Sequence, residues 1–325
     1  MYESFFGLDR KPFSLQPDAS FMYLGRRHKL ALHLLQYGLL EETGFTVITG
    51  EIGAGKTTLI QYLMKNILEN VEIGVVHHTH AAFGTIMRSI AGVFDVEHTS
   101  GDNQLIYEAF VEKLEALHAD GKRAILIVDE AQNLAADTLE ELRMLSNVNS
   151  GERFLLQVIL VGQPQLLATL KKPELVQLVQ RVGISYHLET FELPETLAYI
   201  RHRVDIAGGK GDLFDDLACA AVHHFANGTP RLINQLCDLS LVYAYGDDGK
   251  SVTFDTVCEV AENRIGSGLS AFRSVPDGQT ANAFKQELLD RLYGRTGASP
   301  DQEDADETGD RSSNVQLRAV APGDA

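Results

Sequence analysis

The chain has 325 residues, of which 44% are hydrophobic and 22% are charged, so it is large enough for one or two ordinary globular domains. Its 45 acidic and 28 basic residues give a net charge of −17. This charge argues against generic binding to nucleic acid, which depends on Lys and Arg that neutralise phosphates. Three cysteines without a C-x-x-C pair indicate neither a zinc site nor a redox couple.

The N-terminus does not resemble a secretory signal, because charged residues begin at residue 3 and no long apolar run follows. No stretch approaches the roughly 18 uninterrupted apolar residues that a membrane-spanning helix needs. We therefore expect a cytoplasmic protein without a membrane span of its own.

Up to about residue 192, segments of strand type alternate with segments of helix type, after an aromatic N-terminal arm at 1–25. Several strand segments are apolar throughout, as is typical of parallel strands that are buried on both faces. The alternation predicts an α/β fold in which helices cover both faces of a parallel sheet. We expect strands at 45–49, 71–78, 123–130, 154–162 and 183–191, and helices at 26–42, 60–69, 83–94, 103–119, 136–147 and 164–180.

From Pro194 onward the strand pattern stops, and four further helical segments predict a small helical domain. After Gly266 the composition becomes that of a linker, with one amphipathic helix expected at 281–293 and an acidic run near the end. We expect this last part to be dispensable for activity. The predicted division is an α/β domain with its N-terminal arm at 1–192, a helical lid at 193–266, and a linker, short helix and disordered acidic tail at 267–325.

The segment GEIGAGKTTL, which begins at Gly50, has the spacing G-x-x-x-x-G-K-[ST] of a phosphate-binding loop. In such loops, glycines let consecutive backbone N–H groups face the phosphates, and the next helix adds a favourable dipole. Lys56 then reaches the β- and γ-phosphates, and Thr57 supplies a hydroxyl for Mg²⁺. We expect ATP to contact the loop residues Gly50, Glu51, Ile52, Gly53, Ala54, Gly55, Lys56, Thr57 and Thr58.

The buried strand at 123–130 ends in two acids, in the segment ILIVDE. Asp129 can hold Mg²⁺ through water, and Glu130 can orient and polarise the attacking water. Apolar residues followed by two acids are common by themselves. After a phosphate-binding loop, with one strand inserted between the two motifs, they are typical of NTPases that carry a catalytic glutamate, an arrangement that simple nucleoside kinases lack.

Five segments carry a resemblance to one family: FFGLDRKPFSLQPDASFMYLGRRHKLAL, ILIVDEAQNL, ILVGQPQL, LVQRVGISYHL and NGTPRLINQLCD. Taken with the phosphate-binding loop, they look like the AAA+ ATPases of the general secretion pathway protein A group, and the resemblance covers about residues 1–266. Members of this group also occur with pilus assembly and with exopolysaccharide loci.

The resemblance assigns roles to three more residues. Gln163 matches the sensor 1 position near the γ-phosphate, and Arg231 matches sensor 2, which the lid places over the phosphates. Arg181 matches an arginine finger that reaches the nucleotide of a neighbouring subunit, so an ATP-dependent homo-oligomer is implied. Without the family, Arg181 would be a surface ion-pairing residue and Gln163 a helix cap, whereas a cation such as Arg231 is disfavoured at a helix start. The arm should pass near the adenine, with His28 as one candidate contact.

The segment HHTH, His77 to His80, has no nearby Cys or acid to complete a metal site, so we interpret it as polar residues at a strand end. The residues that follow lack the aromatic–hydrophobic–Gly triplet of polypeptide-gripping loops. This absence argues against a protein-remodelling ring.

The favoured function is a cytoplasmic AAA+ ATPase that powers or regulates a secretion or cell-envelope export or assembly system. Its partner would be an unidentified protein of that system, which could hold it at the inner membrane. The alternative is an ATP-dependent, DNA-bound regulator of the transposition-ATPase type, which the acidic charge disfavours. Group members with a peptidoglycan-binding region carry a membrane span after the ATPase module. This chain shows none, which favours its membrane-free relatives.

Overall fold

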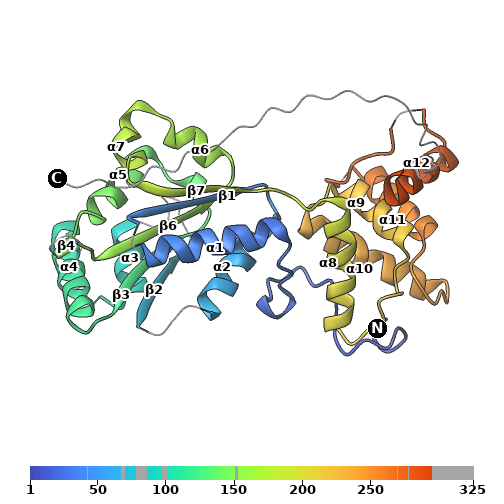
Figure 1. The fold of residues 1–325 in the computed structure, drawn as a ribbon, viewed down its shortest axis with the longest axis horizontal. Coiled ribbons are helices and arrows are strands. Elements are labelled where there is room, and N and C mark those ends of the chain that lie inside the picture. Colours follow the sequence, from blue (N-terminus) through green and yellow to red (C-terminus); the bar gives the residue numbers. More distant parts are fainter. Residues whose placement is uncertain are drawn as a thin grey trace, which may run out of the picture.

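Within the residues that the computed structural model describes, five parallel strands form one sheet, in the order β2-β3-β6-β1-β7 (Figure 1). The described residues are 1–41, 43–66, 70–77, 86–96, 102–150, 153–268, 270–276 and 278–294. The strands of the sheet are β1 (Phe45–Gly50), β2 (Val71–Val76), β3 (Arg123–Val128), β6 (Leu156–Gly162) and β7 (Val182–Leu188). The predicted parallel α/β fold is confirmed, and β6 lies between β1 and β3 in the sheet.

Helices cover both faces of the sheet. Successive side chains of a strand point to opposite faces, so each buried strand contributes to the apolar clusters on both sides. In β3, Ile125 and Ile127 belong to the apolar cluster that α1 and α2 cover, whereas Leu126 and Val128 belong to the cluster under α3, α4 and α5 (Figure 1). The helices of this domain are α1 (Arg26–Leu40), α2 (Lys56–Lys65), α3 (Ile86–Val93), α4 (Asn103–Ala119), α5 (Ala136–Leu145), α6 (Gln165–Leu170) and α7 (Val176–Val179).

Short elements complete this domain. A two-stranded ladder joins β4 and β5, and single 3-10 turns lie within the arm, after β3 and after α6. The turn after β3 matters for the site, because it begins directly after Glu130. These elements are β4 (Asn149–Ser150), β5 (Arg153–Phe154), η1 (Ala19–Phe21), η3 (Ala131–Asn133) and η4 (Pro173–Leu175).

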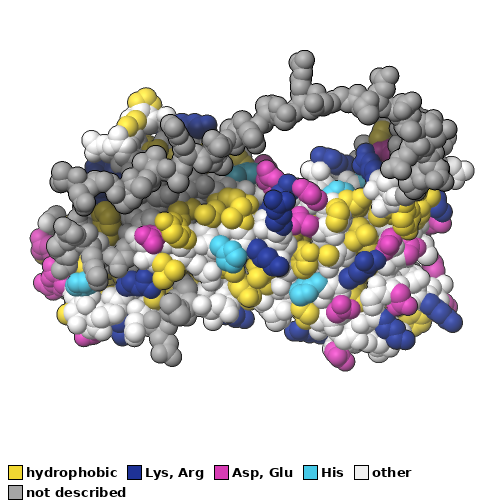
Figure 2. All heavy atoms as spheres, viewed as in Figure 1, with side chains coloured by type: hydrophobic (Ala, Val, Ile, Leu, Met, Phe, Trp, Pro, Cys, Tyr) yellow, Lys and Arg dark blue, Asp and Glu magenta, His cyan; other side chains and the backbone are white. Residues whose placement is uncertain are grey.

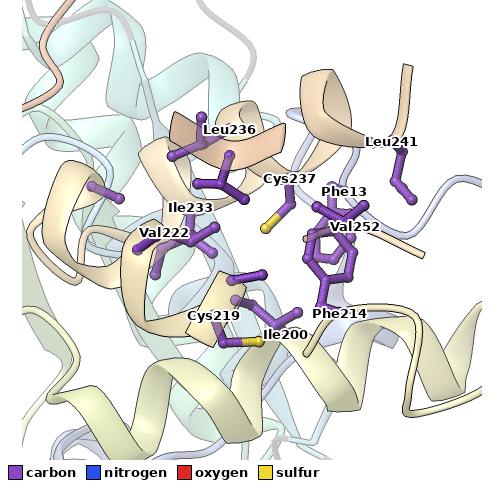
Figure 3. Close-up of a cluster of buried hydrophobic side chains, with 14 of the residues drawn as sticks. Phe13, Ile200, Phe214, Cys219, Val222, Ile233, Leu236, Cys237, Leu241 and Val252 are labelled. Carbon is purple, nitrogen blue, oxygen red and sulfur yellow. The ribbon is translucent and has the colours of Figure 1, made fainter. Parts of the chain in front are cut away.

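A second, all-helical core stands beside the sheet and forms the lid (Figure 1). Figure 3 shows Cys219 and Cys237 among apolar side chains in this core, where burial raises the pKa of the Cys219 thiol to about 12. Both cysteines therefore act as small hydrophobic residues. The lid helices are α8 (Leu193–Ile206), α9 (Asp216–Ala226), α10 (Pro230–Gly246), α11 (Phe254–Gly266) and α12 (Ala281–Tyr293).

The N-terminal arm packs into the lid core, although the sequence division groups it with the α/β domain. Phe13 is fully buried there and lies beside Val252 in Figure 3. The hydroxyl of Tyr2 donates a hydrogen bond to Asp238 on α10. The arm thus connects the start of the chain to helices that are more than 180 residues away.

The helix expected at 281–293 is present as α12, and it contributes to the lid core. Phe284 and Leu288 are each only 1% exposed. The Phe284 ring centroid lies 5.8 Å from that of Phe225 on α9 and 5.9 Å from that of Phe254 on α11. The segment just before it is also attached, since the N–H of Arg273 donates to the carbonyl of Phe225. The packed lid therefore extends beyond residue 266.

Candidate nucleotide site

The loop between β1 and α2 contains glycines at which a side chain would displace a neighbouring residue or strain the backbone. Gly53 and Gly55 have φ angles of 81° and 96°, in the left-handed region that favours glycine. A Cβ on Gly53 would come within 2.6 Å of the Arg231 side chain, and one on Gly55 within 3.1 Å of the His28 ring. A Cβ on Gly50 would meet the carbonyl of Leu188 at 2.6 Å. Arg231 of the lid and His28 of α1 therefore pack directly against this loop.

Lys56 is buried at the start of α2, and its Nζ donates to the carbonyls of Gly50 at 2.7 Å and Glu51 at 2.9 Å. Burial lowers the pKa of this ammonium group, while the carboxylates of Glu130 and Asp129 oppose that shift. A bound anionic ligand would further favour the charged lysine.

Thr57 and Asp129 meet although they are 72 residues apart, since the Thr57 hydroxyl donates to Asp129 Oδ2 at 3.0 Å. Asp129 is 7% exposed, and its backbone N–H donates to the carbonyl of Val76 at the end of β2. Hydroxyl and carboxylate oxygens are the ligand types that Mg²⁺ takes in nucleotide sites. The pair therefore fits a magnesium ion that is shared with bound phosphates.

A cavity of about 190 Å³ lies between the loop, the arm and the lid. Of the loop residues that the sequence predicts to bind ATP, Gly50, Glu51 and Ala54 do not line it. The lining comprises Ser14–Asp18 of the arm, Ile52, Gly53, Gly55, Lys56, Thr57 and Thr58 of the loop, Glu130 and Gln163, and Tyr199, Arg203, Pro230, Arg231 and Asn234 of the lid.

Glu130 and Gln163 face this cavity from the ends of β3 and β6. Glu130 has φ 55°, an uncommon conformation for a residue other than glycine. Gln132, in the turn that follows, donates from Nε2 to Glu130 Oε2 at 2.6 Å and accepts from the backbone N–H of Gln163 at 2.9 Å. The Gln163 side chain itself lies 3.4 Å from Glu130 Oε2. The sequence motif contained Gln132, in DEAQ, but gave no reason to single it out.

Arg231 lies at the start of α10, where its side chain lines the cavity and its backbone N–H donates to the carbonyl of Gly53 at 3.2 Å. Pro230 precedes it at the first helical position, which suits a residue without an N–H. A guanidinium at this helix start would find its counter-charge in a phosphate. The lid residue predicted as sensor 2 is thus next to the phosphate-binding loop.

Arg181 is not at the cavity of its own chain. It immediately precedes β7, and its carbonyl accepts from the N–H of Phe45, at the start of β1. The phosphate-binding loop follows the other end of β1, six residues further on. At about 3.3 Å per residue, the two ends of this strand lie roughly 17 Å apart. The Arg181 guanidinium instead lies 3.3 Å from Ser146 Oγ.

Three polar lid residues at the cavity, Tyr199, Arg203 and Asn234, were missed by the sequence analysis. The hydroxyl of Tyr199 donates to Asn234 Oδ1 at 2.8 Å and accepts from the Arg203 guanidinium at 2.8 Å. Arg203 is 6% exposed, donates to the carbonyl of Pro12 at 2.5 Å and stacks over the Phe21 ring. This network therefore joins α8, α10 and the arm.

His28 does not line the cavity but contacts the backbone of the phosphate-binding loop. It is 2% exposed, and its Nε2 lies 3.1 Å from the carbonyl of Ala54, which requires the proton to be on Nε2. Burial lowers the pKa of this imidazole. Its ring also lies 5.0 Å from that of Phe191, in the connection to the lid.

Of the histidines in HHTH, His77 is described, and its Nδ1 lies 3.8 Å from Asp129 Oδ2. The other three, and the residues through 85 on which the argument against a polypeptide-gripping loop rested, lie outside the described residues. In the described part of the chain, no group of His, Cys, Asp and Glu could hold a metal by itself. Nor does that part contain a helix long and apolar enough to cross a membrane.

A model of the AAA domain family matches residues 40–170 of the chain. Over 246 residues, the chain is 37% identical to general secretion pathway protein A of Aeromonas hydrophila, a match that covers 75% of this chain and 45% of that protein. The chain is an AAA ATPase of this type. It spans less than half the length of this relative.

Solved structures show the same AAA+ fold. The ATPase resembles ORC2 of Aeropyrum pernix in ADPNP–ADP complexes, with a TM-score of 0.61 and 16% identity over 91% of this chain and 86% of that one. It also resembles CDC6p of Pyrobaculum aerophilum, with a TM-score of 0.58 and 16% identity over 76% and 70% of the two chains. The fold is therefore that of a nucleotide-binding AAA+ ATPase.

Proposed function

We propose that this ATPase binds ATP with Mg²⁺ and hydrolyses it to power or regulate a secretion or cell-envelope export or assembly system from the cytoplasm. The observation that carries the ATPase site is one cavity that Lys56, Thr57 and Glu130 line from the sheet domain and Arg231 lines from the lid, with Asp129 hydrogen-bonded to Thr57. The similarity to general secretion pathway protein A supports the secretion role.

Each residue has a chemical role in this proposal. Backbone N–H groups of the glycine-rich loop and the Lys56 ammonium bind the phosphates. Thr57 and Asp129 would hold Mg²⁺, which would supply positive charge to neutralise the phosphates. Glu130 orients and polarises the attacking water, while Gln163 and Arg231 bind the γ-phosphate from the sheet and from the lid. Because one nucleotide then contacts both domains, its state sets their relative angle.

The active form in this proposal is an ATP-dependent homo-oligomer. Arg181 lies at the opposite end of the strands from the phosphate-binding loop, so it can serve the nucleotide of a neighbouring subunit but not its own. Head-to-tail contacts of this kind close into rings or continue as filaments. An arginine donated in this way stabilises the charge of the transition state and makes hydrolysis depend on assembly.

The secretion role can be tested with Glu130→Gln locked on ATP as bait and Lys56→Ala as the matched bait that cannot bind nucleotide. An export or envelope-assembly protein that is retained by the first bait and not by the second would support the proposal. The interaction must then be reconstituted with the two purified proteins and must depend on ATP. Retention that is equal on both baits would contradict an ATP-driven role.

The alternative, an ATP-dependent DNA-bound regulator, receives less support. The net charge is −17, and on the uncovered part of the face in Figure 2, Lys and Arg side chains are interspersed with Asp and Glu. Binding to DNA needs a basic surface that follows the phosphates. ATP-dependent retention of duplex DNA by the Glu130→Gln protein at physiological salt would favour this alternative over the secretion role.

A further inference from the structure

Gln132 joins the two strand ends that carry Glu130 and Gln163. Its Nε2 donates to Glu130 Oε2 at 2.6 Å, and its Oε1 accepts from the backbone N–H of Gln163 at 2.9 Å. The first hydrogen bond holds the Glu130 side chain, whereas the second connects Gln132 to the backbone directly after β6. The amide therefore ties the Glu130 carboxylate to a rigid part of the sheet.

The backbone around Gln132 is shaped to allow this contact. A Cβ on Gly162 would lie 2.9 Å from Gln132 Oε1 and 3.2 Å from its backbone nitrogen, so any larger residue would push the amide away. Glu130 has φ 55°, which turns the chain sharply after β3 and leads directly into the turn that holds Gln132. The absence of a side chain at Gly162 and the turn after Glu130 therefore both allow the bridge.

We propose that Gln132 is a positioning residue for ATP hydrolysis, which holds the Glu130 carboxylate in register with Gln163. This inference rests on the proposed ATPase role of Glu130. Gln132 does not line the cavity and acts through Glu130. A primary amide suits the task, because it carries a donor and an acceptor on one planar group. With the bridge intact, the Glu130 carboxylate and the end of β6 keep a fixed relative position when the nucleotide binds.

The test replaces Gln132 with methionine, which keeps the length and volume of the side chain but loses both hydrogen bonds. We expect kcat to fall by about 10- to 100-fold, because the carboxylate loses its 2.6 Å hydrogen bond and with it the connection to the backbone after β6. KM and the Kd for ATP should change by less than about 3-fold, since neither depends on the position of Glu130. Gln104→Met is the matched control, because Gln104 makes an exposed hydrogen bond to Glu108 on α4 and does not line the cavity.

Gln132→Glu is a second variant of the same shape, which can still accept from Gln163 but repels the Glu130 carboxylate. It should lose at least as much kcat as the methionine variant. Both variants should keep the wild-type thermal stability in the presence of ATP to within a few degrees, which separates positioning from misfolding. If the methionine variant fails to fold, the glutamate variant alone decides the question.

A kcat for Gln132→Met within 2-fold of wild type would overturn the inference, and so would a raised KM with an unchanged kcat. In either case, Gln132 would only satisfy the N–H of Gln163. This failure is distinguishable from failure of the proposed function, in which the wild-type protein itself would not hydrolyse ATP or Glu130→Gln would remain active.

Discussion

The two walls of the nucleotide cavity differ in how their residues are held. In the sheet wall, Lys56 begins the helix that follows β1, and Glu130 and Gln163 come after the ends of β3 and β6, so the backbone of the sheet sets their positions. In the lid wall, Tyr199 and Arg203 are fixed by side-chain hydrogen bonds to another helix and to the arm. The rigid wall suits chemistry, whereas the lid wall is joined by contacts that can rearrange with the nucleotide.

Among the substitutions in the sheet wall, Lys56→Ala should have the largest effect on nucleotide binding. Without the phosphate cation, ATP binding should be abolished, so that ATP with Mg²⁺ no longer raises the melting temperature as it does for wild type. Lys65→Ala, on the exposed end of the same helix, is the control and should keep the full shift. Equal shifts in Lys56→Ala and wild type would refute the assignment of the loop.

Glu130→Gln should separate binding from chemistry within the same wall. The amide keeps the shape of the side chain but loses its charge, so ATP should bind while turnover falls by up to about 10⁴-fold. Single-turnover hydrolysis with labelled ATP measures both quantities. Glu115→Gln, exposed on α4, serves as the control. Turnover near the wild-type rate would mean that another group positions the water.

Arg181→Ala tests whether a third region, at the start of the outer strand β7, contributes to the nucleotide site of a neighbouring subunit. ATP affinity should change little, while hydrolysis slows by about 10³-fold. Wild-type specific activity should also rise with protein concentration. Mixing Arg181→Ala with Glu130→Gln should restore activity at those interfaces where an intact Glu130 meets an intact Arg181. No recovery despite demonstrated co-assembly would show that Arg181 does not act between subunits.

Phe284→Ala should weaken the lid as a folded unit and leave the sheet wall intact. Removing this fully buried ring should cost about 3–5 kcal/mol of unfolding free energy. Tyr293→Ala on the same helix, where the side chain is 60% exposed, should cost far less. Urea denaturation provides the measurement. The sequence analysis expects the residues after Gly266 to be dispensable for activity. Equal stability of Phe284→Ala and wild type would show that α12 does not contribute to the folded lid.

Tyr199→Phe should have the smallest effect, because it removes one hydroxyl from the lid wall and keeps the ring. The hydrogen bonds to Asn234 and Arg203 are lost, which should raise the KM for ATP by about 2- to 10-fold with little change in kcat. Tyr107→Phe on α4 is the control. A fall in kcat without a change in KM would show that the lid network acts on chemistry rather than on nucleotide binding.

The sequence by itself determined the sheet wall, because its chemistry is local. Gly53, Gly55 and Lys56 lie within four consecutive positions, and Asp129 follows a run of apolar residues that can only be a buried strand. The meeting of Thr57 with Asp129 then follows from parallel strands that end at one edge of the sheet. The residue roles drawn from the family resemblance remain predictions until the experiments above are done.

Only the tertiary structure decided the hydrogen-bond network of Tyr199 and Arg203 in the lid wall and the bridge at Gln132. Arg203 bonds to Pro12 across 191 positions, and Gln132 meets Gln163 across 31, and contacts at such separations leave no period or spacing in the sequence. The same holds for Phe13 of the arm and Phe284 of α12, since an apolar residue in either segment does not indicate which core will bury it. Burial against a distant surface is set by the packing of the whole chain, and that packing becomes visible only when the fold is complete.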